Sequence, residues 1–293
     1  MIKNISAIGL KSVEKNKRIL SAIVKNAART PDKSFSFHRK DGKSSVENYG
    51  YLGESYGIII YGIADENGDI RTRRWNSFAH SDNSFNVVNV SFEKMHNGDV
   101  FAYCEDEETG TELEFRVNNL IDYSHFRAKA EIPVMNEAAV NIAALGRIGN
   151  IIFPVEKNKD TIKIRDEETS KIRELMRLFR NGDESAEKKL IDHSMEIASA
   201  VRERLKTEDV LSVFEGYCLP YGEVDGTYAL LGDIAEVGYL ENKLTEETIY
   251  NISINVTGVK FNLYINKNDV VGMPIKGMRF MGICDMQGNI EFV

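Results

Sequence analysis

Cysteine is scarce in this sequence, and the three that occur lie far apart. Cys104, Cys218 and Cys284 are odd in number, and each falls in a segment with the alternation of a strand. A disulfide framework and a structural zinc site both need cysteines at close, regular spacing. The spacing excludes those two classes, so we expect three small buried apolar side chains in a reducing compartment.

Long apolar runs are also missing. No run approaches the roughly 20 residues that a membrane-spanning helix needs. Residues 1–7 are too short and too polar to form the apolar core of a signal peptide. We therefore expect a cytoplasmic protein with no membrane-embedded part.

Positive charge is in deficit. The chain has 37 Lys and Arg against 45 Asp and Glu, a net charge of −8 at pH 7. The segment 210–293 has eleven acidic and five basic residues. Proteins that bind nucleic acid or anionic membranes non-specifically depend on an excess of cations. This balance argues against both kinds of partner.

Catalytic, cofactor and metal motifs do not fit their surroundings. The segment 53–57 has the G-x-S-x-G spacing of a nucleophile elbow, but an apolar strand follows Ser55 instead of preceding it. Gly42-Lys43-Ser44 lacks the earlier glycine of a phosphate-binding loop. The histidines show no close ligand spacing. They are His38, His80, His96, His125 and His193. We predict no catalytic residue, no cofactor and no metal site from these patterns, although histidines distant in sequence can meet in space.

A helical hairpin is the clearest pattern that the chain does contain. Within residues 166–206, apolar side chains recur at helical spacing after three acidic residues, 166–168, that suit a helix N-terminus. Asn181 or Gly182 can end the first helix in the left-handed conformation, and Asp183 can cap the second. The first apolar stripe consists of Ile172, Leu175, Met176 and Phe179. We expect this stripe to pack within the chain; a partner-binding surface is the alternative.

The N-terminal segment, residues 1–84, is expected to hold one helix and β-hairpins. Ser12 can cap a helix that runs to about Ala28. Asp41-Gly42 and Asn67-Gly68 are turn signals between strands.

Two β-rich segments flank the helical hairpin and share local sequence. Residues 109–118 match 257–266, each beginning Thr-Gly and continuing as an alternating strand that ends in Asn. Gly149-Asn150-Ile151 matches Gly288-Asn289-Ile290 in the same order. Together these matches predict an internal duplication. The chain then divides into segments 1–84, 85–156, 157–208 and 209–293.

Each β segment reads as five strands with a short helical connection after the third. We place the fourth and fifth strands on either side of Gly149-Asn150 in the first segment and of Gly288 in the second. This is the strand order of a small barrel of the oligonucleotide/oligosaccharide-binding (OB) type. A β-sandwich or an open sheet of the same strand count is the alternative. The expected fold class is α+β, mostly β, with two related OB-like units joined by a helical hairpin.

Several segments carry a resemblance to a known family. They are Ala7-Ile8-Gly9-Leu10, residues 208–213, residues 217–222 and the strands that follow. These segments resemble an uncharacterised family of clostridial (Firmicutes) proteins. That family has no assigned activity, ligand or catalytic residue, so the resemblance implies a cytoplasmic bacterial protein and nothing about its chemistry.

Function is the least determined property of the sequence. We expect a non-enzymatic binding or adaptor protein that acts through protein–protein contacts. The candidate binding surface comprises Tyr217, Pro220, Tyr221 and Tyr264. Nucleic acid is disfavoured, because the predicted outer face of the second unit has one aromatic residue and one lysine. The alternative is an enzyme or small-ligand binder whose site is assembled only in three dimensions.

Overall fold

A computed structural model describes most of the chain. It covers residues 3–39, 41–65, 68–130, 132–155, 171–172, 174–179, 182–207, 209–214, 216–222 and 224–292. Strands account for 48% and helices for 21%, so the prediction of a mostly β protein is confirmed. Within these ranges, no helix has both the length and the apolar composition that a membrane crossing requires.

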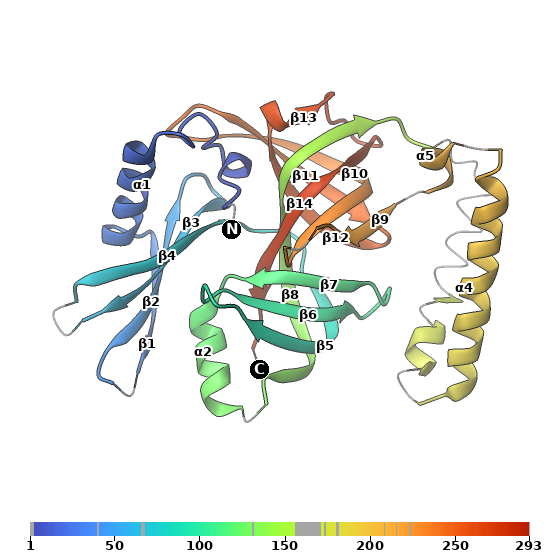
Figure 1. Cartoon of the computed structure of the whole chain (residues 1–293), viewed down its shortest axis with the longest axis horizontal. Helices are drawn as coiled ribbons and strands as arrows, with labels where there is room; N and C mark the ends of the chain where they lie inside the picture. The colour runs from blue at the N-terminus through green and yellow to red at the C-terminus, as the bar shows by residue number, and fades with distance from the viewer. Residues whose placement is uncertain are drawn as a thin grey trace.

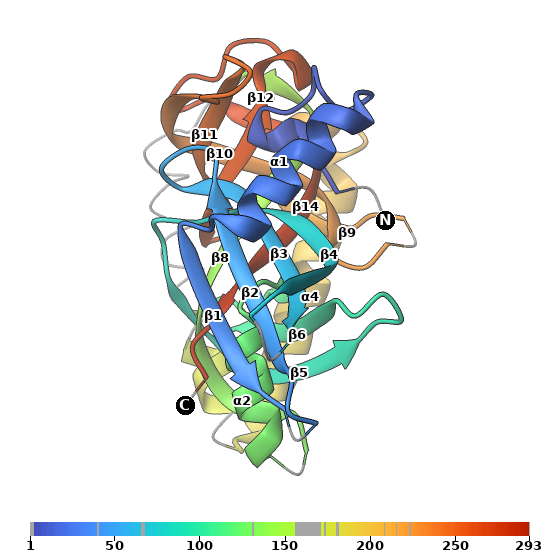
Figure 2. The same ribbon diagram turned by 90° about the vertical axis from the view of Figure 1, so that its left-hand side faces the viewer.

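The N-terminal segment forms a four-stranded antiparallel sheet with a helix across one face. The strands pair in sequence order, as hairpins. They are β1 (Lys33–His38), β2 (Ser44–Tyr51), β3 (Tyr56–Ala64) and β4 (Ile70–Ala79). Helix α1 (Lys17–Arg29) crosses this sheet in Figure 2. Its Ala27 is buried with Ile58 and Ile60 of β3, which explains the small residue at this point of contact.

Helix α1 begins later than the sequence suggested. Asn16 caps it, and the Asn16 side chain accepts a hydrogen bond from the Ile19 N–H. Ser12, the predicted cap, instead donates its backbone N–H to Glu247 on a distant segment. The prediction of a Ser12 cap was therefore wrong, because a tertiary hydrogen bond holds this residue outside the helix.

The remaining strands form one ten-stranded sheet that incorporates both β-rich segments. The first segment supplies β5 (Phe85–Lys94), β6 (Val100–Asp106), β7 (Glu112–Val117) and β8 (Val134–Ile152), with α2 (Leu120–Lys129) between the last two. The second supplies β10 (Thr227–Glu241), β11 (Thr248–Val256), β12 (Val259–Asn266) and β14 (Arg279–Ile290). Short strands β9 (Tyr217–Pro220) and β13 (Val270–Val271) and the 3-10 helices η1 (Ser6–Ile8) and η2 (Lys267–Asp269) complete the fold.

The sheet closes into two rings that share the antiparallel pair β8–β14, visible at the centre of Figure 1. The first ring runs β5-β6-β7-β14-β8, and the second runs β10-β11-β12-β8-β14. In each ring the third strand lies parallel to the shared strand of the other segment, β7 with β14 and β12 with β8. Each segment therefore completes the ring of the other, and one apolar core fills both.

The expected division into fourth and fifth strands was wrong. Strand β8 continues through Gly149-Asn150 and β14 continues through Gly288 without a turn. Gly149 and Gly282 lie directly opposite each other in the β8–β14 pair, and the Phe280 ring lies where a Cβ of either glycine would be. These glycines serve close packing between strands, which a sequence pattern cannot distinguish from a turn.

Helix α2 joins the first ring to the N-terminal sheet. Its aromatic side chains meet those of β5 and the C-terminal segment in one cluster, formed by Phe92, Tyr123, Phe126 and Phe292. At the N-terminus of α2, the Ile121 N–H donates to the buried Glu47 of β2. Because helix N-termini favour negative groups, this carboxyl group connects the sheet to the helix.

The helical hairpin is described in part. Residues 171–172 and 174–179 are helical, and α4 (Glu184–Arg204) follows. Gly182 has the predicted left-handed conformation (φ +87°), and the Asp183 carboxylate accepts from the Ser185 N–H as the predicted cap. Both predictions are confirmed. The acidic residues 166–168 and Asn181 lie outside the described residues.

The central residues of the apolar stripe on the first helix face the first ring. Leu175 is buried, whereas Phe179 at the end of the stripe is 44% exposed. Met176 lies against Gly110, in the turn between β6 and β7. In Figure 1, α4 stands beyond this helix at the edge of the molecule.

Leu175→Asp should lower the free energy of unfolding by about 2 kcal/mol, because it removes a buried leucine and places a charge in its position. Thermal melts and size-exclusion chromatography of the two proteins measure this. Leu178→Asp, at a half-buried position of the same helix, should lower the free energy of unfolding by a smaller amount. An unchanged melting temperature with altered association would instead identify the stripe as a partner surface.

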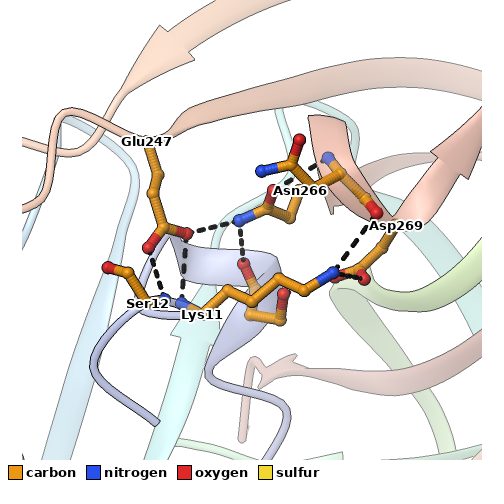
Figure 3. Close-up of polar contacts among 7 residues, drawn as sticks. Lys11, Ser12, Glu247, Asn266 and Asp269 are labelled. Carbon is orange, nitrogen blue, oxygen red and sulfur yellow. Dashed lines mark hydrogen bonds and ion pairs between the residues drawn. The ribbon is translucent and has the colours of Figure 1, made fainter.

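A polar network ties the N-terminal segment to the second ring (Figure 3). Glu247 accepts hydrogen bonds from the backbone N–H groups of Lys11 and Ser12 and from the Asn266 side chain. Lys11 forms an ion pair with Asp269. The donors and acceptors drawn in Figure 3 satisfy one another. We therefore interpret the network as a structural connection between the two parts and not as a ligand site.

Candidate functional site

Three of the four predicted surface residues lie together, and the fourth does not. Tyr217 and Pro220 are the ends of β9, and Tyr221 follows it with 50% of its surface exposed. Tyr264 is 1% exposed. Its hydroxyl donates to the His80 carbonyl and lies 2.9 Å from the Ser55 hydroxyl. The prediction that Tyr264 belongs to an exposed binding surface was wrong, because the N-terminal sheet covers that side of β12.

A groove of about 490 Å³ lies between β9 and the outer face of β5, β6 and β7. Its floor is made of side chains that alternate with the core residues of these strands. Cys218, Leu219 and Pro220 form the opposite wall. The floor residues are Asn89, Ser91, Tyr103, Glu105, Glu112 and Glu114.

Both sides of the groove are edges of the sheet. Strand β9 pairs with β10 and ends the path of hydrogen-bonded strands. Strand β7 pairs with β6 along its length but reaches β14 only at Arg116 and Val117. An edge strand presents backbone N–H and C=O groups to which another extended chain can pair.

The electrostatics of the groove are acidic. Glu105, Glu112 and Glu114 line it, and among its described lining residues there is no lysine, arginine or histidine. Burial raises the pKa of Glu114; a hydrogen bond from the Gly226 backbone opposes this effect, and the nearby carboxylates of Asp225 and Glu93 add to it. The buried Oε1 atom of Glu114 has no hydrogen-bond partner. A cationic donor at this position would reduce the repulsion between these carboxylates. It would also give the Oε1 atom of Glu114 a hydrogen bond.

Two other groups set the shape of the groove. The Tyr228 hydroxyl accepts a hydrogen bond of 2.8 Å from the Glu114 N–H, which fixes β7 against the second ring. Burial raises the pKa of the Cys218 thiol to about 12, so this thiol is neutral and not a nucleophile at physiological pH. The groove therefore presents carboxylates and the edge of a strand, together with a neutral thiol.

Ser55, which has the spacing of a nucleophile elbow, does not have the surroundings that such an elbow needs. The Ser55 hydroxyl pairs with Tyr264, and Ser55 belongs to the loop between β2 and β3, not to a strand-to-helix turn. Among the described residues, no three His, Cys, Asp or Glu side chains are placed to hold a metal. The sequence signal that could have revealed the groove was the acidic outward alternation of 112 and 114, but its facing wall, β9, lies about a hundred residues away.

Comparison with known families identifies the family of this chain. A family described as "Domain of unknown function, E. rectale Gene description (DUF3881)" matches residues 5–288. The chain belongs to this family. The resemblance to an uncharacterised family is thereby confirmed, and the DUF3881 match covers the N-terminal sheet and both rings. Searches of curated proteins and of solved structures found no match.

Proposed function

We propose that this DUF3881 protein is a non-enzymatic binding protein of the cytoplasm. Its partner is a protein that presents an extended, basic segment to the groove. The observation that carries this proposal is an acidic groove bordered by β9, whose outer edge pairs with no other described strand. Backbone pairing supplies affinity for an extended chain, and the carboxylates select lysine or arginine side chains at alternate positions.

The second ring supports this proposal by analogy. Asn262 on β12 occupies the position that matches Glu114 on β7 in the local sequence repeat. The Asn262 side chain accepts hydrogen bonds from the Ser81 hydroxyl and the Asp82 N–H of the segment after β4. In the second ring, therefore, a segment of the same chain covers this face. We infer that the corresponding face of the first ring takes a segment of another protein.

The analogy rests on an internal duplication, which we also propose. The pairing pattern of β5, β6, β7 and β8 repeats in β10, β11, β12 and β14, which supports it alongside the two sequence matches. The closed pairing of each ring, with the strand that the other segment contributes, supports our assignment of both rings to the OB type. An experimental structure in which residues 87–155 and 228–293 differ in strand order would refute the duplication.

Nucleic acid remains an unfavourable partner under this proposal. OB-type proteins bind oligonucleotides on the face of strands 2 and 3, where basic and aromatic side chains gather. Here the same face carries Glu105, Glu112 and Glu114. Phosphates would be repelled, whereas a basic peptide would be attracted.

One observation favours the alternative of a small-ligand site or enzyme. A cavity of about 160 Å³ between the N-terminal sheet and α2 is lined by Glu47, His80, Asp122 and Asn289. Burial raises the pKa of Glu47 to about 7, within the range useful for proton transfer. A metabolite that raises the melting temperature of wild type but not of Asn289→Leu would support this alternative; the absence of any such compound would refute it.

The peptide proposal predicts binding of a labelled, alternating Lys-Val peptide of about eight residues, a typical strand length. Fluorescence anisotropy should show affinity that weakens as salt is added, because salt screens the exposed carboxylates. Glu112→Lys should weaken binding at least tenfold, about 1.4 kcal/mol.

Controls separate the groove from general charge effects. Glu14→Lys makes the same charge change at an exposed position before α1 and should leave binding unchanged. A peptide with N-methylated backbone amides should bind poorly, because it cannot pair with an edge strand. Equal weakening by Glu14→Lys, or no binding by wild type, would show that the groove is not such a site.

A further inference from the structure

A buried arginine lies where the two rings meet the N-terminal sheet. Arg116, on β7, is 8% exposed, and its Nη2 atom donates a hydrogen bond of 2.6 Å to the Ser77 carbonyl of β4. The buried Nε atom has no hydrogen-bond partner. Among the described residues, no carboxylate lies within ion-pair distance of this guanidinium.

The neighbouring carboxylates are already engaged. Asp285 accepts two hydrogen bonds from Arg147 and others from Asn4 and Thr227. Asp99 is paired with Arg74. A guanidinium cannot lose its proton at physiological pH, so Arg116 keeps a full buried charge that no described carboxylate pairs with directly; Asp285 attracts it from beyond ion-pair distance.

The charges near Arg116 add to the excess of positive charge. Burial, together with the nearby charges of Arg116 and Arg74, lowers the pKa of Lys3 to about 8. Its ammonium group lies 3.7 Å from the centre of the Trp75 ring. Arg116 and Arg74 are thus close enough to Lys3 to repel its ammonium charge. A bound anion would reduce this repulsion.

A small cavity opens beside these groups. Its charged lining residues are the cations Arg116, Arg147 and Lys3 and the carboxylates Asp225 and Asp285, so cations outnumber carboxylates, and its volume is about 20 Å³. A single water molecule needs about 10–15 Å³ by the same kind of measure. The cavity therefore has room for one small spherical occupant and excludes a phosphate, a sulfate or a carboxylate ligand.

We propose that this cavity is a binding site for a single halide ion, chloride under physiological conditions, held by Arg116. The ion supplies a counter-charge that no described carboxylate provides by direct pairing. The cavity lies where three parts of the fold meet, since Ser77 belongs to the N-terminal sheet, Arg116 to the first ring and Asp285 to β14, which both rings share. This site is separate from the groove and does not depend on the proposed partner.

Crystals of the full chain grown or soaked in sodium bromide test the site directly. We expect one anomalous-scattering peak within hydrogen-bonding reach of the Arg116 guanidinium. In solution, chloride should raise the melting temperature relative to sodium gluconate at equal ionic strength, by roughly 2–4 °C at ten times its dissociation constant. The bulky gluconate anion cannot enter the cavity.

Matched variants assign the effect to Arg116. Arg116→Met should abolish the difference between chloride and gluconate, whereas Lys276→Met, at an exposed cation, should keep it. If Arg116→Met does not fold, the bromide map of the wild type decides alone. A cavity that holds only water in that map, or a chloride effect that survives in Arg116→Met, would overturn the proposal.

Discussion

Gly282→Ala is expected to destabilise the protein by about 3–4 kcal/mol, at the upper end of the cost of overpacking a core. Gly282 lies in β14 opposite Gly149 of β8. An added Cβ would collide with the Ile148 carbonyl oxygen and would lie 2.9 Å from the Gly149 Cα, both of them backbone atoms. Side-chain rotation cannot relieve such contacts, so the shared strand pair would have to separate.

Chemical denaturation of Gly282→Ala measures the loss. Gly238→Ala is the matched control, because Gly238 also lies in a strand but the nearest neighbour of its added Cβ is 3.5 Å away. The control should be neutral or slightly stabilised, since alanine restricts the unfolded chain more than glycine does. Equal stability of the two variants would mean that β8 and β14 are not packed as closely as described.

The second large effect concerns pH and the buried Glu47. Burial raises the pKa of Glu47 to about 7, although the Tyr49 hydroxyl and the Ile121 N–H donate hydrogen bonds to its carboxyl group. The ordinary value is 4.5. A raised pKa means that the folded state favours the protonated group, so its stabilising contribution is complete below pH 4.5. That contribution is lost as the pH rises to 7 and above.

Glu47→Gln should remove this pH dependence. The variant should match the wild type at pH 4 and exceed its free energy of unfolding by about 3 kcal/mol at pH 8. Glutamine can accept from the Ile121 N–H through its carbonyl and donate to the Tyr49 hydroxyl through its amide. Urea titrations of both proteins across this range give the difference, and parallel pH profiles would contradict the assignment.

Glu247 provides a control of opposite sign. Burial acts to raise its pKa, but hydrogen bonds from Ser12, from the Lys11 N–H and from Asn266 outweigh this effect and hold the pKa below its usual value. The contribution of Glu247 is therefore present at neutral pH and is lost as the pH falls through its folded-state pKa. Glu247→Gln should change stability mainly at neutral pH, in the direction opposite to Glu47→Gln.

Local features of the fold were predictable from the sequence because they depend on residues near one another in the chain. The Asp183 cap and the left-handed Gly182 follow from the conformational preferences of these residue types. Alternation along 112–117 correctly placed Leu113 and Phe115 in the core. The family could also be identified from sequence, since its match extends over residues 5–288.

Reasoning from local sequence failed where a segment distant in the chain determines what surrounds a residue. Alternation placed Tyr264 on the face opposite the core of its own ring, which is correct, but the N-terminal sheet then buried that face. Gly149 resembled a turn residue, yet the Phe280 ring explains it. The groove likewise needs β9 beside β7, two strands from different halves of the chain.

The sequence by itself determined the mostly β content, the helix boundary at Gly182 and Asp183 and the acidic character of this protein, because each depends on composition or on short-range spacing. Only the tertiary structure decided that β8 and β14 complete each other's rings, that Tyr264 is buried and that no described carboxylate pairs with Arg116. The physical reason is that periodicity assigns a side chain to one face of a strand but does not specify which segment covers that face.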